Sequence, residues 1–155
     1  MIDTIVEILL VEDNPNDVML ALHAFKKHKL SNHVHVVRDG AEALEFLFCA
    51  GAYADRPPDN PKAVLLDLKL PKVDGLEVLR RLKADPRTQR IPVVMLTSSR
   101  EDQDIKKCYE LGVNSYIVKP VDFEQFVEAT YQLGLYWLLL NEPPQTLERQ
   151  AGAKS

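Results

Sequence analysis

Five residues that could take part in catalysis follow short apolar runs, each at the point where the run ends. They are Glu12 and Asp13 after 6–11, Asp67 after 63–66, Thr97 after 91–96, and Lys119 after 115–118. If the runs are parallel strands, their carboxyl ends meet at one edge of the sheet, where ligands bind in open α/β folds. Three carboxylates that converge there would repel one another unless a cation joined them. Mg²⁺ is the natural candidate, because it takes carboxylate oxygens and keeps positions open for water and phosphate.

These groups are the ones that phosphoryl transfer to a carboxylate needs. Asp67 is the candidate nucleophile, as aspartate is in phospho-aspartyl enzymes. Asp13 and Asp67 would hold the metal, and Glu12 could act through a metal-bound water. Thr97 could donate its hydroxyl to one phosphoryl oxygen, and Lys119 could supply a compact positive charge to another. Such transfers depend mainly on positioning and electrostatics.

The chain alternates between apolar runs that predict strands and segments with helical periodicity. We expect strands at 6–11, 33–37, 63–66, 91–96 and 115–118, and helices from Pro15, at 41–50, after Gly75, at 101–111, and from Asp122 to about Leu140. Five such units predict a parallel sheet with helices on both faces. The flavodoxin-like (βα)5 fold, a doubly wound α/β sandwich with strand order 2-1-3-4-5, fits units of this length. We therefore assign residues 1–140 to one domain and expect 141–155 to be a flexible tail.

Composition narrows the function classes. The chain has 155 residues, 46% of them hydrophobic, and a formal net charge of −4, which argues against nucleic-acid binding because that needs a basic face. Cys49 and Cys108 have no close-spaced partner, which favours reduced thiols over a disulfide or a zinc site. His33 and His35 alternate along an expected strand, but nothing nearby completes a metal ligand set. No segment resembles a signal peptide or a membrane span, so we expect a cytoplasmic protein without membrane contact.

The set Glu12-Asp13, Asp67, Thr97 and Lys119-Pro120 resembles the receiver domain of two-component response regulators, the CheY-like family. The resemblance covers about residues 5–140, and it is specific because five separated positions fall in the right order on the right elements. It implies that Asp67 takes a phosphoryl group from a phosphohistidine of a sensor histidine kinase, in a reaction that requires Mg²⁺. Catalysis would be limited to self-phosphorylation and self-dephosphorylation, so the resemblance implies a signalling protein rather than an enzyme.

The resemblance also implies a set of metal ligands. These are Asp13, Asp67 and the backbone carbonyl of Lys69, with Glu12 in support. The acidic pair is Glu-Asp here, whereas Asp-Asp is commoner in the family, and the variation is a tolerated one.

A signalling pair follows from the same resemblance. After phosphorylation, the Thr97 hydroxyl would shift toward the phosphate and Tyr116 would turn inward. That movement would remodel the face made by the fourth helix, the fifth strand and the fifth helix. The Lys119–Pro120 bond would be cis, as it is in family members. By its residue type alone, Tyr116 could also be an ordinary core aromatic.

Three segments look like the small single-domain regulators that partner phytochrome-type kinases: 11–17, the proline-rich loop 51–61, and 67–71. Only about fifteen residues follow the last expected helix, so output would go through protein contacts. A pseudo-receiver, an interaction module independent of phosphorylation, is the alternative, although it would need none of the acidic, hydroxyl and lysine groups. The charges of the expected site argue against a flavodoxin-type electron carrier and a haloacid-dehalogenase-type phosphatase. In the electron carrier, acids including Asp17 would repel the phosphate of the ligand. In the phosphatase, an aspartate is needed at the position that Lys69 occupies.

The last expected helix carries more apolar surface than one sheet can cover. One stripe at helical spacing contains Phe123, Phe126, Val127 and Thr130, and a second contains Tyr131, Leu135 and Leu138. The second stripe is either covered by the tail or part of an interface, and large exposed apolar patches usually mark interfaces. We expect a two-fold homodimer that involves the fourth and fifth helices and the fifth strand.

Overall fold

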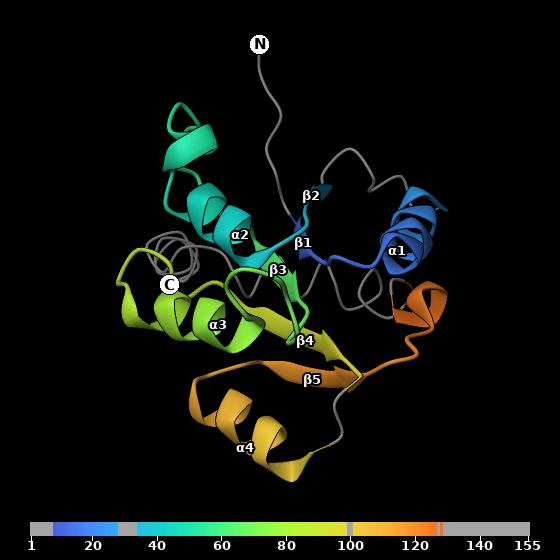
Figure 1. Cartoon of the computed structure of the whole chain (residues 1–155). Coiled ribbons are helices and arrows are strands. Elements are labelled where there is room, and N and C mark those ends of the chain that lie inside the picture. The colour runs from blue at the N-terminus through green and yellow to red at the C-terminus, as the bar shows by residue number, and fades with distance from the viewer. Residues whose placement is uncertain (1–7, 28–33, 99–100, 127, 129–155) are drawn as a thin grey trace, which may run out of the picture.

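A parallel sheet forms the centre of the molecule (Figure 1). The computed structural model describes residues 8–27, 34–98, 101–126 and 128. The strands are β1 (Ile8–Val11), β2 (Val34–Val37), β3 (Ala63–Leu66), β4 (Val93–Thr97) and β5 (Ser115–Val118). They lie in the order β2-β1-β3-β4-β5, and every neighbouring pair is parallel. The predicted flavodoxin-like topology is confirmed.

Helices cover both faces of this sheet. They are α1 (Pro15–Lys27), α2 (Gly40–Leu47), α3 (Gly75–Ala84) and α4 (Asp102–Glu110), with a helical turn at 123–126. Side chains of α1 and of the turn pack on one face, and side chains of α2, α3 and α4 pack on the other (Figure 1). The expected continuation of the last helix to Leu140, its second apolar stripe and the tail 141–155 lie outside the described residues.

Side-chain caps fix where the helices begin. Asn14 Oδ1 accepts hydrogen bonds from the backbone N–H groups of Asn16 and Asp17, at 2.9 and 3.3 Å. The expected cap at Asn14, with Pro15 in the first helical position, is thereby confirmed. Asp39, Asp74 and Asp122 cap α2, α3 and the turn at 123–126 in the same way.

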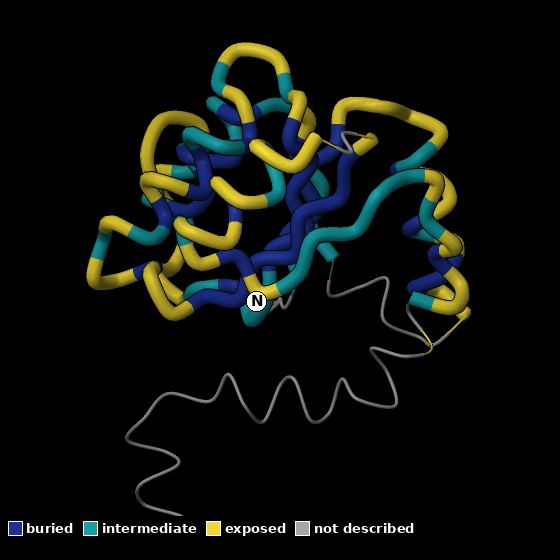
Figure 2. Tube along the Cα trace, turned by 90° about the horizontal axis from the view of Figure 1, so that it is seen from below, coloured by how far each residue is buried: buried dark blue, intermediate teal, exposed yellow. Residues whose placement is uncertain are grey.

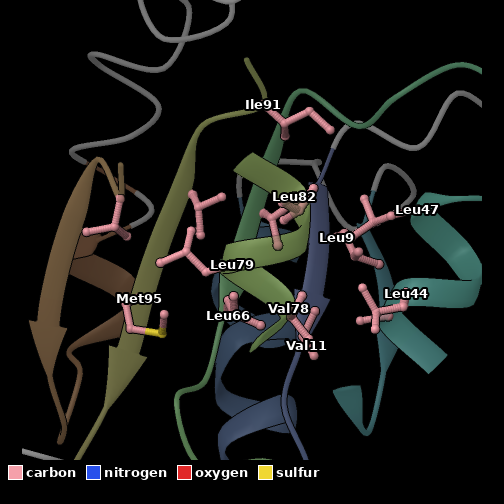
Figure 3. Packing of buried hydrophobic residues seen from close by; sticks show 14 of the residues in the cluster. Leu9, Val11, Leu44, Leu47, Leu66, Val78, Leu79, Leu82, Ile91 and Met95 are labelled. Carbon is pink, nitrogen blue, oxygen red and sulfur yellow. The ribbon is translucent and has the colours of Figure 1, made fainter. Parts of the chain in front are cut away.

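Strand residues alternate between two hydrophobic layers because successive side chains point to opposite faces. Leu9 and Val11 of β1 pack with α2 and α3, whereas Leu10 packs with α1. Figure 3 shows the first layer, with Leu79 of α3 and Leu44 of α2 facing the strands. In Figure 2 the strands form a buried centre, and exposed positions lie on the outer sides of the helices.

The segment that the proline content predicts to be a loop is partly ordered by side chains. A 3₁₀ helix, η2, covers Gly51–Tyr53. The Tyr53 hydroxyl donates to Glu42 Oε2 at 2.6 Å, and His35 Nε2 lies 3.0 Å from the same hydroxyl oxygen. Because the single hydroxyl proton goes to the carboxylate, His35 Nε2 must be the donor to Tyr53. His35 also stacks on Phe46, with ring centroids 4.7 Å apart. This histidine lies on the edge strand β2 and is part of a packed network.

This network predicts a contribution of His35 to acid sensitivity. Burial lowers the pKa of His35, and the Arg56 charge adds to this while Glu42 opposes it. The folded state therefore binds this proton less readily than the unfolded state, and stability is lost as the pH falls below about 6.5. When the pH falls from about 7.5 to about 5.5, we expect the unfolding free energy of His35→Gln to change in a more stabilising direction than that of the wild type.

Urea unfolding at both pH values measures this difference. The matched control is His23→Gln, which removes an exposed histidine of α1 and should follow the wild type. Equal pH-dependent changes in unfolding free energy in His35→Gln and the wild type would contradict the prediction.

None of the helices in the described part of the chain is both long and apolar enough to cross a membrane.

Candidate functional site

The predicted site residues come together at the carboxyl edge of the sheet. Thr97 is the last residue of β4, and Lys119 directly follows β5. The Glu12 N–H donates to the Val37 carbonyl at 3.0 Å, and the Asp67 N–H donates to the Val11 carbonyl at the same distance. The strand ladder thus extends through the first residue after β1 and β3, which fixes the backbone of both acids.

Lys119 joins the acidic groups of this edge. Its Nζ lies 2.9 Å from Glu12 Oε1 and 3.3 Å from Asp67 Oδ2. It also lies 2.8 Å from Asp17 Oδ2, in the first turn of α1. The sequence pattern predicts that Lys119 meets Glu12 and Asp67, but it does not predict that Asp17 contacts Lys119. The spacing of Asp17, four residues after Asp13 on a helix that starts at this edge, was the available signal.

Burial changes how these groups titrate. The Glu12 side chain is 2% exposed, and burial raises the pKa of Glu12 to about 7. The hydrogen bond from Lys119 works against this rise, and the Asp67 charge adds to it. Burial alone would lower the pKa of Lys119, but its contacts with Asp17, Glu12 and Asp67 outweigh that effect and raise it. The Lys119 ammonium is therefore held in its charged form, whereas burial disfavours the ionised form of Glu12.

The donor set at this edge fits a divalent cation. Oxygen atoms of Glu12, Asp13 and Asp67 lie within 4.8 Å of one another, and clustered carboxylates are the ligands that Mg²⁺ prefers. Asp13 is exposed, whereas Glu12 and Asp67 are buried. The Lys69 N–H points at the cluster and lies 3.4 Å from Asp67 Oδ1.

The expected signalling pair lies on β4 and β5. Thr97 is fully buried. Tyr116 is half-buried and packs against the core layer that includes Met95. Because Tyr116 is in register with Met95, and Thr97 follows Met95 by two residues, both side chains project from the same face of the sheet. The Lys119–Pro120 peptide bond is cis.

Two glycines hold the loop that follows Asp67. A Cβ on Gly75 would overlap the Asp67 carbonyl oxygen, and a Cβ on Gly40 would overlap the Val73 carbonyl oxygen. The Gly40 N–H also donates to the Pro71 carbonyl at 3.3 Å. The loop from 68 to 74 therefore lies directly against the first turn of α2, a contact that sequence analysis did not predict.

The model of the response regulator receiver domain matches residues 8–131. The chain belongs to this family. The receiver fold accounts for the doubly wound sheet and for the acidic residues, hydroxyl and lysine at its carboxyl edge, and proteins of this family act in signalling.

Known regulatory proteins resemble this chain along most of its length. The probable methanogenesis regulatory protein FilR2 of Methanothrix harundinacea is 42% identical over 137 residues, covering 88% of this chain and 86% of that protein. The structure of the bacteriophytochrome response regulator RtBRR is 52% identical, with a TM-score of 0.75 and coverage of 97% and 93%. The Mn²⁺-bound response regulator Rcp1, from a Synechocystis strain, is 39% identical, with a TM-score of 0.72 and coverage of 84% and 93%.

Proposed function

We propose that this receiver domain takes a phosphoryl group from a sensor histidine kinase onto Asp67. The observation that carries the proposal is the position of Lys119, whose Nζ lies within 3.3 Å of both Asp67 and Glu12. A partly buried ammonium beside the buried carboxylates of Glu12 and Asp67 suits a site that must accept an anionic phosphoryl group. A pseudo-receiver needs none of these groups.

The chain's own residues would divide the work. Asp67 Oδ would attack phosphorus while the bond from phosphorus to the phosphohistidine nitrogen breaks. Lys119 and the Thr97 hydroxyl would each donate to a phosphoryl oxygen. Asp13, Asp67 and the carbonyl of Lys69, supported by Glu12, would hold Mg²⁺, which would neutralise charge on the transferred group. The Mn²⁺-bound form of Rcp1 supports a divalent cation here.

A phytochrome-type histidine kinase is the proposed partner. RtBRR, at 52% identity, is described as a bacteriophytochrome response regulator, whereas the 42% identical FilR2 is described as a methanogenesis regulator. The higher identity to RtBRR favours a phytochrome-type kinase as the partner. This chain and its kinase would both act in the cytoplasm, where histidine kinases use ATP. The test compares the rate of phosphotransfer to this chain from a purified bacteriophytochrome kinase with the rate from an unrelated sensor kinase.

Output would go through the face made by α4, β5 and the last helix. Thr97 and Tyr116 project from the same side of β4 and β5, and Tyr109 of α4 is 51% exposed. We propose that phosphorylation moves Thr97 and Tyr116 and changes this face, and that the face also supports a homodimer. Sedimentation at high concentration, with and without beryllofluoride as a phosphoryl mimic, tests the dimer. A monomer under both conditions would exclude it.

Direct phosphorylation tests the central proposal. We expect the wild type with Mg²⁺ and acetyl phosphate to gain one phosphoryl group by intact mass, and Asp67→Asn to gain none. EDTA should abolish the gain because the carboxylate cluster then has no divalent cation. The matched control is Asp59→Asn, which changes an aspartate of the 54–61 segment away from this edge and should leave the gain intact. A folded wild type that gains no mass would favour the pseudo-receiver.

A further inference from the structure

Asp17 binds the catalytic lysine from outside the residues that define the family motif. Its Oδ2 lies 2.8 Å from Lys119 Nζ, the shortest of the three carboxylate contacts that this ammonium makes within the described residues. The Asp17 backbone is fixed, because its N–H donates to the Asn14 cap at 3.3 Å. The Asp17 side chain is 24% exposed, so the pair is only partly solvated.

Three carboxylates of the described residues hold Lys119. Its Nζ donates hydrogen bonds to Glu12 and Asp67 and forms an ion pair with Asp17. The longest contact, at 3.3 Å, is the one to Asp67. We propose that Asp17 is a positioning residue that draws the Lys119 ammonium toward α1 and thereby slows phosphorylation of Asp67.

This inference rests on the proposed function and concerns its rate. In the transfer, a bond forms between an Asp67 carboxylate oxygen and phosphorus. The bond from phosphorus to the donor breaks, and the leaving group keeps its electron pair. Lys119 must give up carboxylate contacts and donate to a phosphoryl oxygen as charge develops there. Asp17 competes for the same ammonium at that moment, so removing its charge should release Lys119 toward the reacting atoms.

Asp17→Asn tests the proposal without changing the shape of the side chain. The measurement is the phosphorylation rate constant as a function of acetyl phosphate concentration, in saturating Mg²⁺, by intact mass. We expect the maximal rate constant to rise about three- to tenfold, the size expected for one charged contact in a partly solvated pair. The half-saturating concentration should stay the same, because Lys119 acts on the transferring group. A fall in that concentration with an unchanged maximal rate constant would mean that Asp17 only repels the donor, and it would overturn the proposal.

Glu124→Gln is the matched control for net charge. Glu124 pairs with Lys27 at 3.1 Å on the surface and is 57% exposed, away from Lys119. The Glu124→Gln variant should become phosphorylated at the wild-type rate. Thermal unfolding of each variant checks that the fold is retained.

A double-mutant cycle shows whether Asp17 acts through Lys119. In a Lys119→Met background, Asp17→Asn should leave the rate constant unchanged. An effect that persists there would overturn the proposal, as would an Asp17→Asn single variant that is no faster than the wild type. If the wild type is phosphorylated normally, such a result overturns only the role of Asp17, and the proposed function stands. A wild type that takes no phosphoryl group would overturn the role of Asp17 and the proposed function together.

Discussion

Replacing Gly40 by alanine is expected to lower the free energy of unfolding by about 3 kcal/mol, near the upper end for overpacking. The new Cβ would overlap the carbonyl oxygen and carbon of Val73. These are backbone atoms, so the loop from 68 to 74 must move as a unit. The hydrogen bond from the Gly40 N–H to the Pro71 carbonyl would be lost with it.

Urea or thermal unfolding measures the loss, and a fall of about 10 °C in Tm is expected for a chain of this size. Gly112→Ala is the comparison, because Gly112 has a φ of +99° but its Cβ would make only ordinary van der Waals contact with the Lys83 side chain, at 3.6 Å or more. It should cost about 1 kcal/mol from backbone strain alone. An equal cost at both positions would show that the contact between Gly40 and the loop is unimportant.

The same substitution should weaken metal binding. The loop that Gly40 holds begins at Asp67 and contains Lys69, whose carbonyl is a proposed ligand. Calorimetric titration with Mg²⁺ should give a lower affinity in Gly40→Ala and a wild-type affinity in Gly112→Ala. This result would connect α2 to the site through the loop rather than through general loss of stability.

Removing the Glu12 carboxyl group is expected to remove a large part of the pH dependence of stability in EDTA. Burial raises the pKa of Glu12 from 4.5 to about 7. Between these values the folded state therefore binds this proton more readily than the unfolded state, and stability falls as the pH rises through the window. The contribution is fully present below about pH 4.5. It amounts to about 2–3 kcal/mol lost between about pH 5 and pH 8.

Urea unfolding of Glu12→Gln at several pH values tests this expectation. The variant should not lose that 2–3 kcal/mol, because glutamine stays neutral. Glu110→Gln, which changes an exposed acid of α4, should follow the wild type. Mg²⁺ should reduce the loss in the wild type, because the cation stabilises the ionised carboxylates. A wild-type pH dependence that persists in Glu12→Gln would contradict the prediction.

The strands and the site edge could be predicted from the sequence because they depend on local patterns. The apolar runs 63–66 and 115–118 are β3 and β5 to the residue. Once the strands are parallel, topology alone brings their carboxyl ends to one edge. The residues Glu12, Asp67 and Lys119 then meet although they are far apart in the chain.

Contacts between separate loops and helices could not be predicted in the same way. Gly40 starts α2 beside a loop from another strand, and no periodicity in the sequence encodes that close approach. Asp17 contacts Lys119 because of the reach of a lysine side chain and the direction in which α1 leaves the sheet. The loop after α2 has turn residues, which predict irregular backbone. They do not reveal that Tyr53 and Glu42 hold part of it in place.

The sequence separation within the site has a consequence for the order of folding. Glu12 and Asp67 follow β1 and β3, which are direct neighbours, whereas Lys119 follows β5 at the far edge of the sheet, 107 residues from Glu12. Pairing over such distances is slow, because chain closure must precede any stabilising contact. A partly assembled sheet with β1 and β3 paired would place two acids side by side before their lysine arrives. Divalent cations and low pH should therefore speed refolding, and a stopped-flow measurement would detect the acceleration.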